Sequence, residues 1–189
     1  MRLTARIASA LAIVAAFSAP ALAGDVRTDR QIVKDVSNAV MTYVRYTVFD
    51  DISVSVDQGA VILSGRVTMP FKKTDIEKRV SQVPGVTHVE DKVTVLPVSM
   101  FDDDLRYVIA RAIYSDSAFT PYAAMPNPPV HVIVENGQVT LTGVVNSNVQ
   151  RTLALAIASR FNGFSVTNEL KTDEEVRAAL TKSFDAQIR

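Results

Sequence analysis

The chain has 189 residues, of which 48% are apolar and 21% charged, and this balance excludes a disordered protein. Twenty basic residues face twenty acidic ones, so the chain lacks the positive excess that attracts nucleic acid. It has no cysteine, which excludes disulfide scaffolds, thiolate metal sites and cysteine nucleophiles, and it has only two histidines. This composition argues against an enzyme, and we predict neither a cofactor nor a bound metal.

The first 23 residues have the pattern of a secretory signal peptide. A start with two arginines precedes an apolar run over residues 7–17 and the small-x-small site Ala21-Leu22-Ala23. The apolar run is too short to span about 30 Å of hydrocarbon, and Pro20 interrupts it, which disfavours an uncleaved anchor. We therefore predict cleavage after Ala23 and export to the periplasm. Residues 24–189 keep 18 basic and 20 acidic residues, a net charge of −2.

One segment of the chain recurs 78 residues later, which indicates an internal duplication. Residues 52–67 read ISVSVDQGAVILSGRV, and residues 130–145 read VHVIVENGQVTLTGVV. Apolar and polar residues alternate in both copies, which is typical of strands with one buried face. A two-residue turn signal divides each copy, so each is predicted to form an antiparallel hairpin.

Four glycines occupy equivalent places in the two copies. Gly59 and Gly137 lie in the turns, where glycine tolerates a positive φ. Gly65 and Gly143 lie inside the second strand, where glycine normally weakens a strand. We expect all four to be structural, the second pair at a bulge or where a helix comes close to the sheet; a ligand at that place is the alternative.

Helices and a third strand complete each copy. Apolar residues at helical spacing predict a helix before and after each hairpin, and a third strand follows each second helix. We therefore predict an α+β fold of two tandem α-β-β-α-β units, over residues 25–99 and 100–172, each a small three-stranded sheet with two helices. The short joint between the units predicts that they touch. Residues 173–189 are predicted to form a C-terminal amphipathic helix that docks on a unit or, alternatively, on a partner.

The second unit differs from the first by five extra residues between its first helix and first strand, in the region 119–129. Pro126, Pro128 and Pro129 in that region predict a stiff, non-helical loop. Before the same helix, the run Asp102-Asp103-Asp104 is expected to cap the helix and offset its dipole, with a cation site as the alternative. Consecutive aspartates lack the spacing of a calcium loop.

No arrangement typical of catalysis stands out in the sequence. His131 alternates with Val130 and Val132 in the predicted strand, so we expect it on the surface. Neither His131 nor His88 has a serine or carboxylate nearby in the pattern of a triad. We therefore assign no catalytic residue and no metal ligand.

Motifs in both copies resemble the BON domain (bacterial OsmY and nodulation) family. The pattern Gly-x-Val-x-Leu-Ser/Thr-Gly-x-Val occurs at residues 59–67 and 137–145, and residues 85–93 carry the family's ending, which is altered at residues 163–170. The resemblance covers about Asp25 to Thr172. It implies the α-β-β-α-β fold and a periplasmic, non-enzymatic protein that binds anionic phospholipid surfaces and supports envelope integrity or osmotic-stress tolerance. The alternative is a protein-interaction module, either a chaperone-like stress factor or an accessory subunit of an envelope assembly.

The first helix of the second unit carries the candidate contact surface. If its apolar stripe faces the core, Tyr107, Arg111 and Tyr114 lie on the opposite side, a combination that suits a lipid headgroup boundary. The following loop adds further candidates for lipid or partner contact: Phe119, Tyr122 and Met125. The favoured alternative is that this face packs on the first unit or on the C-terminal helix. A second alternative for a membrane contact is a basic patch formed by Lys72, Lys73, Lys78 and Arg79.

Overall fold

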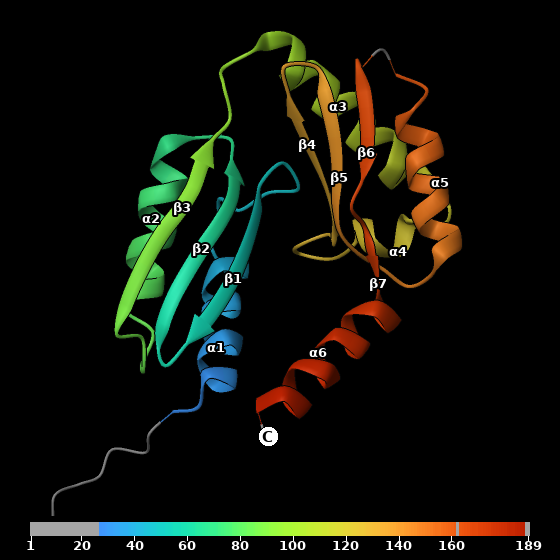
Figure 1. Ribbon diagram of the computed structural model, residues 1–189. Coiled ribbons are helices and arrows are strands. Elements are labelled where there is room, and N and C mark those ends of the chain that lie inside the picture. Colours follow the sequence, from blue (N-terminus) through green and yellow to red (C-terminus); the bar gives the residue numbers. More distant parts are fainter. Residues whose placement is uncertain (1–26, 162, 188–189) are drawn as a thin grey trace, which may run out of the picture.

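The computed structural model describes residues 27–161 and 163–187, so the predicted signal peptide lies outside the described residues. Two α+β units follow one another along the chain, and a last helix extends from the second unit (Figure 1). The order α-β-β-α-β occurs twice, which confirms the predicted fold class. The elements are α1 (Asp29–Met41), β1 (Asp51–Asp57), β2 (Ala60–Val67), α2 (Pro70–Ser81), β3 (His88–Val95), α3 (Met100–Ser115), α4 (Thr120–Ala123), β4 (Val130–Glu135), β5 (Gln138–Val145), α5 (Asn148–Ala158), β6 (Ser165–Asn168), β7 (Lys171–Thr172) and α6 (Asp173–Gln187).

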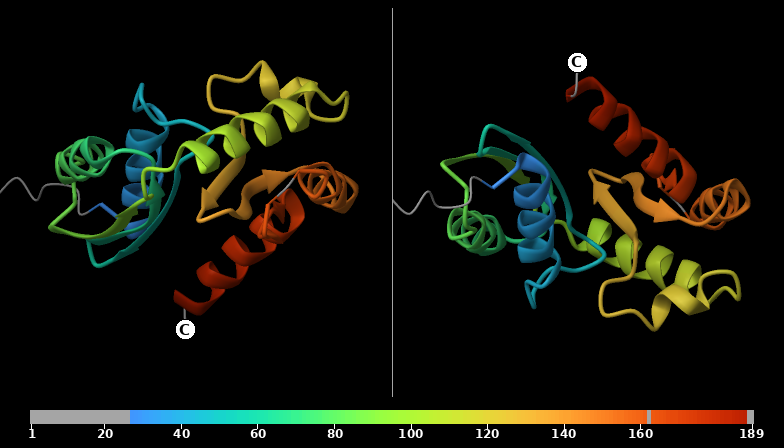
Figure 2. Two further views of the ribbon diagram at one scale, coloured as in Figure 1. Left: turned by 90° about the horizontal axis from the view of Figure 1, so that it is seen from above. Right: turned by 90° about the horizontal axis from the view of Figure 1, so that it is seen from below.

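The first unit is a three-stranded sheet covered on one face by two helices. The strand order is β1-β2-β3, with β1 antiparallel and β3 parallel to β2, because α2 returns the chain to the end of the sheet where β2 begins. Figure 2 shows α1 and α2 on the same side of the sheet. Their apolar stripes meet the inward residues of β2 in one core, which includes Ile32, Val36, Val61, Leu63, Ile76 and Val80.

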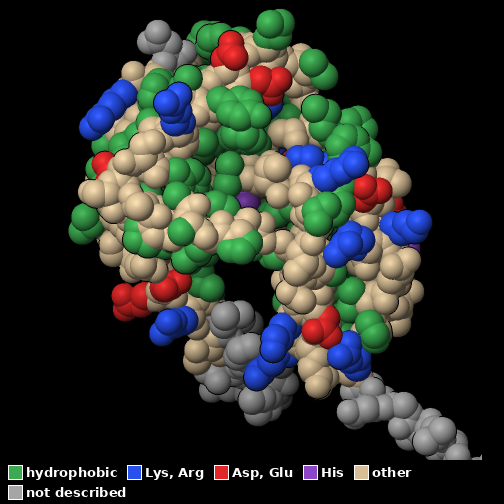
Figure 3. Space-filling model, turned by 180° about the vertical axis from the view of Figure 1, so that it is seen from behind, with side chains coloured by type: hydrophobic (Ala, Val, Ile, Leu, Met, Phe, Trp, Pro, Cys, Tyr) green, Lys and Arg blue, Asp and Glu red, His purple; other side chains and the backbone are tan. Residues whose placement is uncertain are grey.

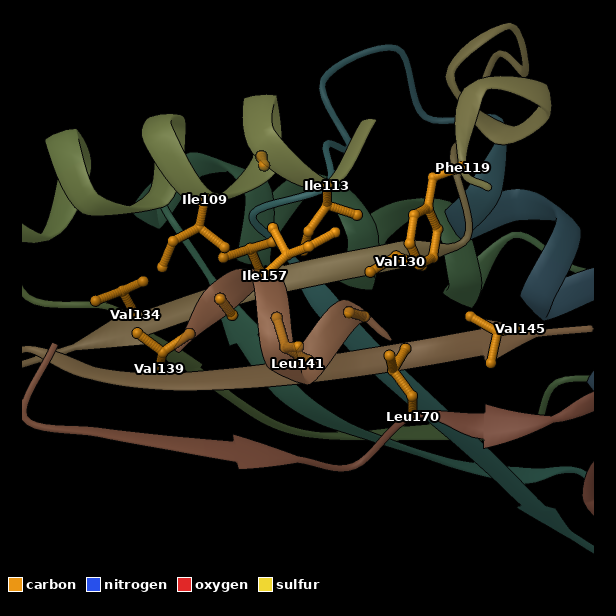
Figure 4. Close-up of a cluster of buried hydrophobic side chains, with 14 of the residues drawn as sticks. Ile109, Ile113, Phe119, Val130, Val134, Val139, Leu141, Val145, Ile157 and Leu170 are labelled. Carbon is orange, nitrogen blue, oxygen red and sulfur yellow. The ribbon is translucent and has the colours of Figure 1, made fainter. Parts of the chain in front are cut away.

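The second unit repeats this arrangement with one change in its last strand. β4 is antiparallel and β6 parallel to β5, and the short β7 pairs with the far end of β5. The predicted third strand is thus divided in two, and Leu170 between the halves turns into the core. The side chain of Asn168 holds the break, accepting from the Leu170 N–H at 3.2 Å and donating to Arg151 O at 2.8 Å. Figure 4 shows the core side chains of α3 and α5 meeting those of β4 and β5.

The two strand glycines stand where the adjoining chain passes too close for any side chain. A Cβ on Gly65 would lie 2.0 Å from Asp51 O, and one on Gly143 would lie 1.9 Å from Pro129 O. Both glycines have positive φ, +123° and +107°, which disfavours other residues. Strand pairing continues in register through Gly65 and reaches Gly143 as its last pair, so no extra residue marks a bulge at either place. The close neighbour is the other arm of the hairpin rather than a helix.

The aspartates that open the two first helices hold the hairpin turns. Asp29 accepts from the N–H groups of Gln58 and Gly59 at 2.8 and 2.9 Å. Asp102 accepts from those of Asn136 and Gly137 at 2.9 and 2.8 Å. The expectation that Asp102 caps its helix is therefore wrong for its side chain, because Ser99 is the N-cap and accepts from the Asp102 N–H at 3.2 Å.

The extra segment of the second unit is partly helical, contrary to the prediction. α4 forms one helical turn, with Pro121 in its first turn, where the missing N–H of proline leaves no intrahelical bond unmade. The turn carries Phe119 and Tyr122 into the core, where they are 0% and 5% exposed. The tyrosine hydroxyl donates to Gln150 Oε1 at 2.8 Å, which fixes the segment on α5.

The last helix, α6, begins directly after β7 and is anchored by its first turn. Glu175 accepts from the Thr172 N–H at 2.9 Å and pairs with Arg151 at 2.8 Å, and these bonds lower the pKa of the Glu175 carboxyl. The start of α6 packs on β7 and β5, and the ribbon then leads away from the second unit (Figure 1). Docking of its amphipathic face on a partner remains a prediction.

Candidate binding surface at the junction of the two units

The segment between α1 and β1, residues 42–50, joins the first unit to the second, and we call it the junction segment. Val132 N–H of β4 donates to Val48 O at 2.7 Å, so the first unit supplies a backbone partner to the outer edge of the second sheet. Val48 and Phe49 pack against the second core, and the Asn127 side chain donates to Met41 O. These contacts fulfil the expectation that the units touch.

His131 lies inside this junction, so the prediction of a surface histidine is wrong. It is 7% exposed, and its ring lies 5.6 Å from that of Tyr46 between centroids. The alternation along β4 correctly turns His131 away from its own core, but the first unit covers that face. Burial lowers the pKa of His131, and the nearby carboxylates Asp51 and Asp50 oppose this shift only partly.

A buried ion pair lies below the same junction. Asp50 is 0% exposed, and its Oδ2 accepts from Lys72 Nζ at 2.6 Å and from the Thr47 N–H at 2.9 Å. Its Oδ1 accepts from the Thr68 N–H at 2.9 Å. Asp50 thus fastens the junction segment to the start of α2, and Lys72 is not a free surface cation. Lys73 is also engaged, with its Nζ donating to Val93 O at 2.6 Å, and Arg79 donates from Nε to Ala39 O at 3.1 Å. Three members of the suggested basic patch therefore make contacts within the first unit.

A groove of about 490 Å³ opens between the units, directly above this ion pair. The junction segment, the start of α2 and the first two turns of α3 form its walls. Its lining residues are Arg45, Thr47, Phe49, Thr68, Met69, Phe71, Lys72, Asp103, Arg106 and Tyr107. The groove therefore combines aromatic and apolar walls with three cationic side chains and one carboxylate.

The three cations of the groove differ in how far they are neutralised. Lys72 is paired with Asp50, whereas Arg106 is paired with Asp103 and donates to Val134 O at 2.6 Å. Arg45 is exposed and lies over the Phe71 ring, 5.0 Å from its centroid. Arg45 is thus the lining cation most available to an incoming anion.

Exposed apolar side chains lie on the linker and at the starts of α2 and α3, and three of them, Met69, Phe71 and Tyr107, line this groove. Val98 is 97%, Met100 84%, Tyr107 65% and Phe101 53% exposed, with Met69 and Phe71 across the groove at 48% and 43%. We call this set the apolar crest. Viewed from behind, the molecule shows hydrophobic side chains on this face with both acidic and basic side chains among them (Figure 3). A surface of this kind suits a partner that offers both an apolar layer and anionic groups.

The predicted contact residues on α3 are divided by the structure. Tyr107 and Arg111 are exposed, and Tyr107 also lines the groove, where its ring meets Phe49 of the first unit edge-on at 5.0 Å. Tyr114 is half-buried, and its hydroxyl donates to Val130 O and accepts from the Val130 N–H. Burial raises the pKa of Tyr114. The face thus packs partly on the first unit, in line with the favoured alternative, and leaves its outer part open.

Two of the predicted loop residues belong to the interior. Phe119 and Tyr122 are core residues of the second unit, so their expected place on a lipid- or partner-facing surface is wrong. Met125 is 46% exposed, at the far end of the loop. The periodicity of α3 located its exposed side, but no periodic signal existed for the irregular segment after it.

Sequence reasoning missed the first unit's share of the groove. Arg45, Met69 and Phe71 come from a loop and a helix start, outside the stripes that periodicity detects. The available signal was Phe71 in the first turn of α2, a large apolar residue out of phase with Ile76 and Val80.

Two other kinds of site are absent from the part of the chain that the structure describes. Residues 27–161 and 163–187 bring together no group of three or more histidine, cysteine, aspartate or glutamate side chains suited to hold a metal ion. Within the same residues, no helix has the length and apolar content needed to cross a bilayer.

The duplicated α-β-β-α-β unit, with its turn aspartate and strand glycine repeated, defines a tandem α+β architecture. Comparison with protein families gives this class a name. The BON domain family matches residues 28–97 and 108–184, and the chain belongs to that family.

Comparison with individual proteins gives two kinds of relative. The chain is 34% identical over 131 residues to "Osmotically-inducible protein Y" of Escherichia coli K12, a match that covers 65% of this chain and 62% of that protein. Among solved structures it is similar to CdsD, described as a structural protein of the type III secretion system of Chlamydia trachomatis. That match is 14% identical with a TM-score of 0.30, covers 80% of this chain and 97% of the other, and carries no functional argument.

Proposed function

We propose that this protein is a periplasmic, non-enzymatic component of the cell envelope that binds anionic phospholipid surfaces. Membership of the BON family and similarity to an osmotically inducible protein support a role in envelope integrity or osmotic-stress tolerance. The signal-peptide pattern supports export. The observation that carries the proposal is the apolar crest, which lies beside a groove containing an exposed arginine.

The chemistry of the crest and groove suits the boundary between headgroups and acyl chains. Met100 and Val98 protrude from a chain bend and can enter that boundary without any change in the fold, because they cover nothing in the structure's core. Arg45 and Arg111 can meet lipid phosphates, with about 1 kcal/mol expected for each cation near an anionic surface. The net charge of residues 24–189 is −2, so attraction at long range is weak and binding depends on local contact.

Co-sedimentation of residues 24–189 with vesicles tests this function. Vesicles of phosphatidylglycerol and phosphatidylethanolamine are compared with neutral phosphatidylcholine vesicles. The double variant Val98→Ser/Met100→Ser is expected to bind at least about tenfold more weakly, since it removes two inserted apolar groups. Val149→Ser is the matched control, because Val149 is 75% exposed on α5, away from the crest.

Charge and insertion are separated by a second arm of the same experiment. Arg45→Ala is expected to lose only about fivefold, and 0.5 M salt is expected to release a minor fraction of the protein. Equal binding of the crest variant and the Val149 control would refute the proposal. Stoichiometric capture of an envelope protein without any vesicle binding would favour the protein-interaction alternative.

A further inference from the structure

β3 is an outer strand of the first sheet, and its free side faces away from the second unit (Figure 1). Backbone groups of successive residues in a strand point to opposite sides. The N–H of Leu96, just after β3, donates to Val67 O at 2.9 Å, which places the even-numbered residues of β3 toward β2. This alternation applies within β3 and ends before it, because the N–H of Thr87 also donates toward β2, to Gly59 O at 2.9 Å. The odd-numbered residues of β3 therefore direct their N–H and C=O groups outward.

One half of this outer edge is closed by side chains. The outward N–H of Val93 donates to Asp91 Oδ1 at 2.8 Å, and the outward Val93 C=O accepts from Lys73 Nζ at 2.6 Å. Capping an edge with charged side chains is a common way to prevent the addition of a further strand. The cap fulfils that role only for the end of β3 near the linker.

The other half of the edge remains open. Among the residues that the structure describes, none is placed as a partner for the outward backbone groups of Val89 or for the backbone N–H and C=O of Asp91. Unpaired backbone groups at a sheet edge form a template for another strand, because only an extended chain offers donors and acceptors at the same repeat. The chemistry of this half-edge thus specifies a polypeptide backbone rather than a lipid.

A groove runs beside the open half of the edge. It has a volume of about 470 Å³ and lies between α2 and β3. Val86 and Val89 form its apolar strand side, and Thr74, Lys78 and Ser81 line its helix side. A strand added to β3 would direct every second side chain toward this groove and the others to solvent. Glu77 and Lys78 carry opposite charges, so the groove does not select its occupant by net charge.

We propose that the open half of the β3 edge, with the groove beside it, binds a short extended segment of another polypeptide as a fourth strand of the first sheet. The segment carries apolar residues at alternate positions, which enter the groove over Val86 and Val89. This interaction is independent of the proposed lipid contact, since it uses neither the crest nor the groove between the units. The second unit offers a shorter edge, because its equivalent strand β6 has four residues whereas β3 has eight.

The test uses residues 24–189 labelled with ¹⁵N and the capped peptide acetyl-Thr-Val-Thr-Val-Thr-amide, titrated to about 1 mM. Binding is expected to shift the amide signals of Val89 and Asp91 most strongly and to slow their hydrogen exchange. Val89→Pro removes the outward N–H and exchanges one apolar side chain of the groove for another, a change that an edge strand tolerates, and it is expected to weaken binding at least tenfold. Val166→Pro is the matched control at the equivalent edge position of β6, and it is expected to leave binding unchanged.

A second pair of probes makes the test independent of protein folding. One peptide is N-methylated at both valines and the other at all three threonines, so that each lacks the residue N–H donors of one side. A fourth strand predicts that one pattern abolishes binding and the other retains it, because only one side faces β3. Equal binding of both patterns, shifts confined to other residues, or no shift up to the highest concentration would each overturn the proposal. Sedimentation velocity without peptide identifies the remaining outcome, in which the edge pairs with a second copy of the chain and excludes the peptide.

Discussion

The two units share a backbone but satisfy one equivalent backbone N–H with different chemistry. In the first unit, the N–H of Thr68 donates to the buried carboxylate Asp50, which is paired with Lys72. In the second unit, the equivalent N–H of Asn146 donates to Gln150 Oε1 and to the Tyr122 hydroxyl, both at 3.0 Å. Gln150 occupies the position of Lys72, 78 residues later. The fold therefore requires an acceptor at this place but does not dictate whether it is charged.

At the hairpin turns the two units make the same choice. Asp29 and Asp102 each accept from two consecutive turn N–H groups across the gap between the first helix and the hairpin. Both turns contain two residues with positive φ, whose N–H groups point toward the helix. A single carboxylate with two oxygens matches this pair of donors, which a neutral side chain of the same length serves less well. The turn therefore requires a side chain with two acceptor oxygens, whereas the other site requires only one hydrogen-bond acceptor.

The largest effect is expected from breaking the charged version of the first site. Lys72→Met leaves Asp50 buried without its cation, and the free energy of unfolding is expected to fall by about 3–5 kcal/mol. Gln150→Met removes a neutral partner at the equivalent site and is expected to cost about 1–3 kcal/mol. Urea unfolding of residues 24–189 measures both. Equal losses for the two variants would show that the charge of Lys72 contributes no more to stability than the neutral amide of Gln150.

The strand glycines provide a test in which the two units should behave alike. Gly65→Val and Gly143→Val each place a side chain closer to a carbonyl oxygen than van der Waals contact allows. Each is expected to lower the free energy of unfolding by about 3 kcal/mol or more. Thermal melts followed by circular dichroism measure the loss. An unchanged melting temperature of either variant would show that its strand can move away without cost. The two units would then differ in their need for this glycine.

A smaller effect is expected where equivalent positions have different surroundings. His131 is buried by the first unit, whereas Ser53, its counterpart 78 residues earlier, is exposed. Because burial lowers the pKa of His131 below its ordinary value of 6.5, the unfolded chain binds this proton more readily. The contribution is fully present above pH 6.5, and stability is expected to decline as the pH falls below it, by at most about 1.4 kcal/mol per pH unit.

The residues around His131 define the control for this measurement. Tyr46 contacts the ring, and Asp50 and Asp51 are the charged groups that face it. His131→Gln is expected to remove the decline between pH 6.5 and 5 that wild type shows, while His88→Gln, at an exposed position, is expected to keep it. Chemical unfolding at each pH gives the result. A wild-type stability that is constant or rises over this interval would contradict the assignment.

Local patterns in the sequence were sufficient for most of the fold. The alternation over residues 52–67 and 130–145 predicts both hairpins, because strand burial has a period of two. The stripes of α1 and α3 predict which faces meet the core, and Ile32, Val36, Ile109 and Ile113 are buried there. The break between β6 and β7 was not predicted, since it depends on the Asn168 side chain reaching the backbone of α5.

The candidate surface was only partly predictable. Tyr107 and Arg111 follow from helical periodicity, whereas Phe119 and Tyr122 were misplaced because an irregular segment has no period that distinguishes its buried side. Arg45 and Phe71 reach the groove only through the contact between the units. Sequence periodicity describes one helix or strand at a time, so it cannot predict which other segment packs on the outer face of that element.

The sequence by itself determined the duplication, the order of elements in each unit and the places where glycine is needed, because these depend on contacts within one unit. Tertiary structure alone decided the burial of His131, the pairing of Lys72 with Asp50 and the existence of the groove between the units. The burial of His131 and the groove result from the packing of the junction segment on β4, which brings distant parts of the chain together. The Lys72–Asp50 pair forms within the first unit, between residues 22 positions apart. Burial at such a place is a property of the pair of surfaces, and neither surface records it in its own pattern of residues.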